Sequence, residues 1–137
     1  MTLDEITVLI VDDEPILQEV CAFWLNQGGY RRVLTASDGI EALTILEGGR
    51  IDMLIADIHM PNMDGVALIR TTRERGLSIP GIIFMSAYMD FDPAEMFNLG
   101  VTKFLEKPFT LEILLEAVET TLSLAFGRTI IADAVDS

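Results

Sequence analysis

The chain has 137 residues, with 22 acidic and 9 Lys or Arg side chains that give a formal net charge of −13. This length suits one domain and leaves little room for a second, and the 50% hydrophobic composition favours a packed core over disorder. The acidic balance argues against direct nucleic-acid binding. No apolar run approaches the roughly 20 residues of a membrane span, so we expect a soluble protein without a membrane partner.

One Cys and one His limit the chemistry that the chain can perform. A single Cys cannot form an internal disulfide, which indicates a reducing, cytoplasmic setting. The usual zinc sites need more Cys and His ligands than this chain has. Its abundant carboxylates suit hard cations, which prefer oxygen ligands.

Short apolar runs alternate along the chain with segments of helical periodicity. The expected strands are residues 6–11, 31–35, 52–56, 79–85 and 102–105, and the expected helices are residues 15–27, 38–47, 65–75, 93–99 and 111–124. Asp12 or Asp13 is expected to cap the first helix, and Thr110 the last. Because the inner runs are apolar throughout, the five βα units predict an α/β fold, with an open parallel sheet and helices on both faces.

Polar side chains follow four of the expected strands. Asp12 and Asp13 follow the first strand, Asp57 the third, Ser86 the fourth and Lys107 the fifth. Each of them alone has an ordinary structural explanation as a helix cap, a turn residue or a solvated side chain. The carboxyl ends of parallel strands gather at one edge of the sheet, so we expect three carboxylates, a hydroxyl and an amine at one mouth.

Three clustered carboxylates repel one another and take up protons unless a cation lies among them. The amine of Lys107 and a divalent ion together would balance the three negative charges. With so few soft ligands in the chain, Mg²⁺ is the expected ion, or Mn²⁺ in its place. A carboxylate beside such an ion can attack a phosphoryl group and form an aspartyl phosphate. Lys107 and Ser86 would then neutralise and hydrogen-bond the transferred oxygens.

The motifs that carry this chemistry occur in a recognisable order. They are Val11-Asp12-Asp13-Glu14-Pro15, Asp57, Met60-Pro61-Asn62-Met63-Asp64-Gly65, Ser86-Ala87 and Lys107-Pro108-Phe109. Together they resemble the receiver domain of two-component response regulators, over about residues 5–124. The set is specific because five separate motifs keep the family's order and similar gaps, whereas any one of them alone is a weak signal.

The resemblance implies a flavodoxin-like (βα)5 fold with a five-stranded parallel sheet of order 2-1-3-4-5. It also implies phosphorylation of Asp57 by a histidine kinase or a phosphotransfer protein in a two-component phosphorelay. Mg²⁺ would be bound directly by Asp13, Asp57 and the backbone carbonyl of His59, and by Asp12 through a water. Such a domain is a regulatory phosphoacceptor and not an enzyme, apart from self-assisted phosphotransfer and slow autodephosphorylation.

A conformational switch is also implied by the resemblance. Lys107 would hold the phosphoryl group, and Pro108 would follow it in a cis peptide. The hydroxyl of Ser86 would swing toward the phosphoryl group while Phe104 turns into the vacated space. This change biases an existing equilibrium and thereby alters partner binding or self-association. Ala87 matches the family's small residue that leaves the phosphoryl site uncovered.

Two further residues are expected at the pocket rim. His59 and Tyr88 occupy positions that vary in the family and affect how quickly the phosphoryl group hydrolyses, so we expect them to tune that rate. Cys21 and Trp24 lie on the apolar face of the first helix with Leu17 and Val20, which indicates packing and not redox chemistry.

The last helix carries two apolar stripes. Leu111, Leu114, Leu115, Val118 and Leu122 form the expected core stripe, and Ile113, Ala117 and Leu124 form a weaker one. We expect a receiver domain over residues 1–124, followed by a tail or truncated linker at 125–137 that is too short for an output domain. The weaker stripe and the tail are candidates for a homodimer interface.

Three alternatives compete with the phosphoacceptor. A pseudo-receiver, an interaction module that is never phosphorylated, usually lacks the pocket acids or the Lys, which are all present here. A haloacid-dehalogenase-type phosphatase needs a second Asp two residues after its nucleophile, where this chain has His59. In a flavodoxin, acids after the first strand would repel the FMN phosphate. The cognate kinase, the downstream protein partner, the oligomeric state and the lifetime of the phosphorylated form stay open, as does whether the receiver is stand-alone or excised.

Overall fold

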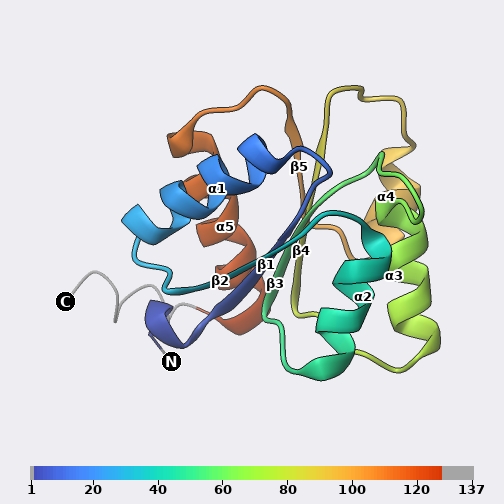
Figure 1. Ribbon diagram of the computed structural model, residues 1–137, viewed down its shortest axis with the longest axis horizontal. Helices are drawn as coiled ribbons and strands as arrows, with labels where there is room; N and C mark the ends of the chain where they lie inside the picture. Colours follow the sequence, from blue (N-terminus) through green and yellow to red (C-terminus); the bar gives the residue numbers. More distant parts are fainter. Residues whose placement is uncertain (1, 128–137) are drawn as a thin grey trace.

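Strands and helices alternate along the chain in the computed structural model, which describes residues 2–127 (Figure 1). Five parallel strands form one sheet of order β2-β1-β3-β4-β5. The strands are β1 Thr7–Val11, β2 Arg32–Ala36, β3 Met53–Asp57, β4 Gly81–Ser86 and β5 Lys103–Glu106. The helices are the 3₁₀ helix η1 Leu3–Glu5, α1 Pro15–Gln27, α2 Gly39–Gly48, α3 Gly65–Glu74, α4 Pro93–Asn98 and α5 Leu111–Phe126. This arrangement confirms the predicted flavodoxin-like (βα)5 fold.

Helices cover both faces of the sheet and create two separate cores. Helices α1 and α5 pack on one face, and α2, α3 and α4 pack on the other, as Figure 1 shows. Val8 and Ile10 of β1 point into the first core, whereas Leu9 and Val11 point into the second. Both sets are buried, which explains why the inner strands read as continuous apolar runs. Within residues 2–127, no helix is long and apolar enough to cross a membrane.

All five strands begin one or two residues later than the sequence predicts. β4 begins at Gly81 and not at residue 79, because Pro80 has no N–H for the ladder and Gly81 donates to the Asp52 carbonyl at 3.0 Å. The side chain of Asp52 accepts the Thr7 N–H outside the β3 ladder. The shift makes Asp57 and Ser86 the last residues of their strands, so the sheet itself fixes where their side chains emerge.

Helix α1 begins at the predicted residue, Pro15, but the predicted cap by Asp12 or Asp13 is not formed. Its N-cap residue is Glu14, and no side chain caps it. Asp12 instead accepts the N–H of Glu14 at 2.9 Å, and Pro15 at the first helical position needs no partner for a backbone N–H. The predicted cap of α5 is confirmed, because Thr110 accepts the N–H of Ile113.

The core stripe of α5 differs from the prediction, because Ala117 and Thr121 belong to it and Leu111 and Leu115 are only partly buried. Ala117 is buried with the core, where it joins a stripe of i, i+3, i+4, i+7 and i+8 spacing. That stripe consists of Leu114, Ala117, Val118, Thr121 and Leu122. Ile113 and Leu124 remain exposed. The helix extends to Phe126, and most of the predicted tail, residues 128–137, lies outside the described residues.

Candidate functional site

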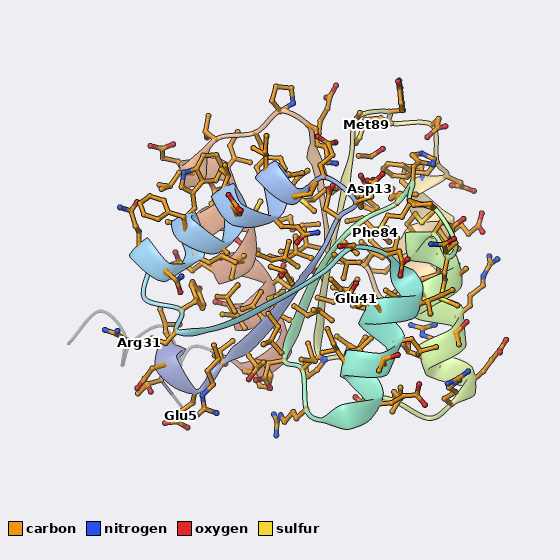
Figure 2. The ribbon with its side chains drawn as sticks, in the orientation of Figure 1. Glu5, Asp13, Arg31, Glu41, Phe84 and Met89 are labelled. Atoms are coloured by element: carbon orange, nitrogen blue, oxygen red, sulfur yellow. The ribbon has the colours of Figure 1, made fainter. Side chains whose placement is uncertain are left out.

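The polar residues predicted to converge lie at the carboxyl edge of the sheet. Figure 2 shows Asp13 and Met89 at this edge, with Glu5 and Arg31 at the opposite end of the molecule. Carboxylate oxygens of Asp12, Asp13 and Asp57 lie within 4.8 Å of one another. In the described part of the chain, this is the one group of three or more potential metal-ligating side chains that are this close.

The three carboxylates differ in burial. Asp12 and Asp57 are buried, whereas Asp13 is exposed and opens the group to solvent. Burial raises the pKa of Asp12, and the charge of Asp57 adds to this, although bonds from Lys107 and the Glu14 N–H act in the opposite direction. Because burial makes the ionised form of Asp12 unfavourable, a cation bound nearby would stabilise it. The all-oxygen donor set therefore fits a hard ion such as Mg²⁺.

Lys107 lies between the two buried carboxylates. Its Nζ donates to Asp12 Oδ2 at 2.7 Å and to Asp57 Oδ2 at 2.6 Å, and lies 3.7 Å from Glu14 Oε1. Burial alone would lower the pKa of Lys107, but the hydrogen bonds and charges of the two carboxylates outweigh it and raise the pKa. The amine is therefore charged at neutral pH. The peptide between Lys107 and Pro108 is cis, as the resemblance implied.

The loop after β3 fixes the carboxylate of Asp57. The N–H of His59 donates to Asp57 Oδ1 at 3.0 Å, so both oxygens of this carboxylate have a partner. The N–H of Gly65 donates a hydrogen bond to the carbonyl of Ile58 at 2.9 Å. A Cβ at Gly65 would lie 2.8 Å from the backbone oxygen of Asp57, so the close approach of α3 needs glycine.

A side-chain hydrogen bond connects the same loop to the start of α2. Asn62 has a φ of 68° and donates from its side chain to Asp38 Oδ2 at 2.7 Å. Asp38 also caps α2 by accepting the N–H of Glu41, and these two bonds lower the pKa of its carboxyl group. This contact was not predicted, because the two residues lie in different βα units.

Ser86 is buried at the end of β4, but its hydroxyl is bonded away from the carboxylates. It accepts the N–H of Tyr88 at 3.0 Å and donates to the carbonyl of the same residue. Ala87 and Tyr88 are both exposed. The structure thus brings Ser86 to the predicted edge, with its hydroxyl engaged by the loop that follows.

Phe104 lies half-buried on β5, with its ring stacked on Phe91. The ring centroids are 4.5 Å apart and the planes differ by 25°. Phe91 lies near the end of the β4–α4 loop and packs against the same core as Phe104. This partner of Phe104 was not predicted, because nothing local in the sequence indicates a contact across two strand–helix units.

His59 is exposed beside Asp57, and its side chain has a partner that was not predicted. Its Nε2 lies 3.1 Å from Asp90 Oδ1, and its ring meets the ring of Tyr88 edge-on with centroids 6.4 Å apart. Asp90 is 31 residues away along the chain. A lone acid in a loop gives no signal from which this pairing could have been predicted.

Known proteins share this sequence pattern. The model of the response regulator receiver domain family matches residues 8–119. The sensor histidine kinase RcsC of Escherichia coli strain K12 is 34% identical over 125 residues, which are 91% of this chain and 13% of RcsC. The regulator of RpoS of the same strain is 37% identical over 101 residues, which are 74% of this chain and 30% of that protein. The chain therefore spans less than a third of the length of these relatives.

Solved structures share the fold as well. The chemotaxis protein CheY4 of Vibrio cholerae superposes with a TM-score of 0.76 and 30% identity, and the match covers 85% of this chain and 98% of CheY4. The response regulator TrrA of Thermotoga maritima, solved in complex with Mg²⁺ and BeF, has a TM-score of 0.74 and 30% identity over 85% of this chain and 99% of TrrA. The sheet order, the carboxyl-edge cluster and the family match agree. The chain belongs to the response regulator receiver domain family.

Proposed function

We propose that the chain is a phosphorylation-dependent switch of a two-component phosphorelay, in which Asp57 accepts the phosphoryl group. The observation that carries this proposal is the position of Lys107 Nζ, within 2.7 Å of carboxylate oxygens of both Asp12 and Asp57. A fixed ammonium beside a nucleophilic carboxylate is suited to pair with the oxygens of a transferred phosphoryl group. The pseudo-receiver alternative is not favoured, because the pocket retains every acid and the Lys.

In the proposed transfer, a carboxylate oxygen of Asp57 attacks the phosphorus of a phosphohistidine on the donor protein. The P–N bond breaks, its electron pair stays on the imidazole, which takes up a proton, and Asp57 becomes an acyl phosphate. Lys107 pairs with the phosphoryl oxygens, while the His59 N–H keeps the aspartyl group oriented. Beyond this self-assisted transfer and slow autodephosphorylation, we assign no enzymatic turnover to the domain.

The proposed metal site uses the hard donors at the carboxyl edge. Asp13, Asp57 and the backbone carbonyl of His59 would hold Mg²⁺ directly, and Asp12 through a water. Mn²⁺ would take the same oxygen donors. When bound, the ion neutralises the clustered carboxylates and polarises the phosphoryl oxygens.

The proposed output is the family's switch. Ser86 exchanges its bond to Tyr88 for one to a phosphoryl oxygen, and Phe104 turns into the space that the hydroxyl leaves. Ala87 leaves room above the phosphoryl group, and the rim residues His59 and Tyr88 tune hydrolysis.

The proposed partners are a histidine kinase or phosphotransfer protein as donor and a downstream protein as target, in the cytoplasm, where the free thiol of Cys21 stays reduced. The receiver would span residues 1–124. Ile113 and Leu124 on α5 offer exposed apolar surface for a homodimer. Size-exclusion chromatography with light scattering, in Mg²⁺ with and without beryllofluoride, distinguishes self-association from a monomeric switch.

Beryllofluoride, which mimics the phosphoryl group, tests the proposal when its binding is followed by Trp24 fluorescence. The Trp24 ring packs edge-on against Phe109, two residues after Lys107, with centroids 6.4 Å apart. We expect a saturable signal that requires Mg²⁺ and is absent in Asp57→Asn. Asp4→Asn, which removes an exposed carboxylate from the opposite end of the molecule, should respond like the parent. A parent-like response of Asp57→Asn would contradict the assignment.

A further inference from the structure

The β4–α4 loop is tied to its neighbours by contacts that the pocket chemistry does not use. Nε2 of His59 pairs with Asp90 at 3.1 Å, and the His59 ring meets the Tyr88 ring edge-on. At the end of the loop, Phe91 stacks on Phe104 with centroids 4.5 Å apart. We call these three contacts the loop brace. They join the loop to the β3–α3 loop on one side and to β5 on the other.

The loop that the loop brace holds begins directly after Ser86 and is bonded to its hydroxyl. A serine hydroxyl has one proton to donate, and here it is donated to the carbonyl of Tyr88. The same hydroxyl accepts the Tyr88 N–H at 3.0 Å. As long as the loop keeps this conformation, the hydroxyl cannot donate to a group on Asp57.

We propose that the loop brace stabilises the conformation in which Ser86 is turned away from the pocket, and so opposes the switch. This inference rests on the proposed function, in which Ser86 bonds the phosphoryl group. His59, Asp90 and Phe91 act as positioning residues: they bias a two-state loop and touch no reacting atom through their side chains. A ligand of the pocket then binds more weakly than it would to a loop that is already released.

The contacts of the loop brace are individually weak, so each shifts the equilibrium between the two loop conformations only modestly. Both side chains of the His59–Asp90 pair are more than half exposed, so the pair shifts an equilibrium by no more than about fivefold. An aromatic stack such as that of Phe91 on Phe104 contributes about twofold to tenfold. The loop brace therefore sets the balance between the two states without locking either of them.

Four variants test the loop brace. His59→Ala, Asp90→Ala and their combination form a double-mutant cycle, which isolates the pair from effects of either residue alone. Phe91→Leu keeps an apolar side chain and removes the stack. Glu112→Gln is the control for charge, because it removes one exposed negative charge at the start of α5 without touching the loop brace.

Two measurements are made on each variant. The first is the exchange rate of the Tyr88 amide hydrogen by NMR without ligand, which reports release of the Ser86–Tyr88 contact. The second is beryllofluoride affinity in Mg²⁺. We expect Asp90→Ala to speed Tyr88 exchange and to tighten beryllofluoride binding by up to about fivefold. Phe91→Leu should change both quantities in the same direction by about twofold to tenfold. The His59→Ala/Asp90→Ala double variant should change each by less than the product of the changes in its two single variants.

Unchanged or weaker beryllofluoride binding in both Asp90→Ala and Phe91→Leu would overturn the proposal, as would an equal gain in Glu112→Gln. If the parent itself does not bind beryllofluoride, it is the proposed function that fails. The loop brace is then judged by Tyr88 exchange alone: faster exchange in the variants supports it, and unchanged exchange overturns it.

Discussion

Two side-chain pairs at the carboxyl edge of the sheet, Lys107 with Asp57 and His59 with Asp90, join distant parts of the chain and differ in their exposure to water. The side chains of Lys107 and Asp57 are 12% and 8% exposed, whereas those of His59 and Asp90 are 51% and 63% exposed. In the first pair, each charge depends on its partner, because water does not reach it freely. In the second pair, water solvates both groups, so their interaction contributes little to the stability of the fold. The buried pair is therefore suited to hold the chemistry, and the exposed pair to adjust a loop.

Of the substitutions considered, replacement of Lys107, which removes the cation of the buried pair, should lower the stability of the fold most. Lys107→Ala leaves the carboxylates of Asp12 and Asp57 buried without their cation, and we expect the free energy of unfolding to fall by about 3 kcal/mol in metal-free buffer. Mg²⁺ should still bind and restore part of the loss, while the beryllofluoride-induced switch disappears. Urea unfolding with and without Mg²⁺ measures this.

Lys103→Ala is the matched control for that experiment. It removes a Lys from β5, the strand that directly precedes Lys107, and no ion pair of Lys103 is found among residues 2–127. Its stability should stay within about 0.5 kcal/mol of the parent. Equal losses in the two variants would show that the buried position of Lys107 has no special role.

A methyl group at Gly65 should disturb the buried pair without altering any charge. In Gly65→Ala the new Cβ would meet the backbone oxygen of Asp57 at 2.8 Å, so the loop or α3 has to move, at a cost of about 1 to 3 kcal/mol. Beryllofluoride affinity should fall, because Asp57 shifts relative to Lys107. Thermal unfolding and fluorescence titration check both effects.

Gly48→Ala provides the control, since no atom lies within 4 Å of a Cβ built at Gly48. This variant should keep parent affinity and equal or exceed parent stability, because Ala is the better helix former. If Gly65→Ala behaves in the same way, the packing of α3 does not hold Asp57 in place.

Neutralisation of Asp12 should have a smaller effect on folding, with a defined pH dependence. Burial raises the pKa of Asp12, so the folded chain holds this proton up to a higher pH than the unfolded chain. The free energy of unfolding of the metal-free parent should therefore fall as pH rises from the usual Asp range through the raised pKa. Asp12→Asn should lack this decline and be the more stable form at neutral pH without metal.

The same variant should weaken Mg²⁺ binding by about 10- to 100-fold, because in the proposed site the carboxylate of Asp12 would contact the ion through a water. Magnesium titrations at constant ionic strength measure the loss. A steeper decline of stability with pH in Asp12→Asn than in the parent would contradict the assigned sign.

The fold and the pocket were predictable from sequence to the extent that strands determine them. Asp12, Asp57, Ser86 and Lys107 end or follow strands of a parallel sheet, so the strand pattern alone brought them to one edge. Ala117 was misassigned because α5 is apolar on more than one face, and only packing against the sheet distinguishes its core stripe.

The rim of the pocket could not be predicted in the same way. The pairing of His59 with Asp90 and the stacking of Phe91 on Phe104 depend on how two loops close over the edge. No strand periodicity determines loop conformation, and the orientation of the Ser86 hydroxyl depends on that conformation. The sequence thus predicts both residues of the buried pair but only His59 of the exposed one.

The central claim, that Asp57 accepts a phosphoryl group, is tested most directly by the intact mass of the protein after incubation with acetyl phosphate and Mg²⁺. We predict that the parent gains the mass of one phosphoryl group, that EDTA prevents the gain, and that peptide mapping after borohydride reduction locates it at Asp57. An equal gain in Asp57→Asn, or no gain in the parent with Mg²⁺ present, would contradict the account.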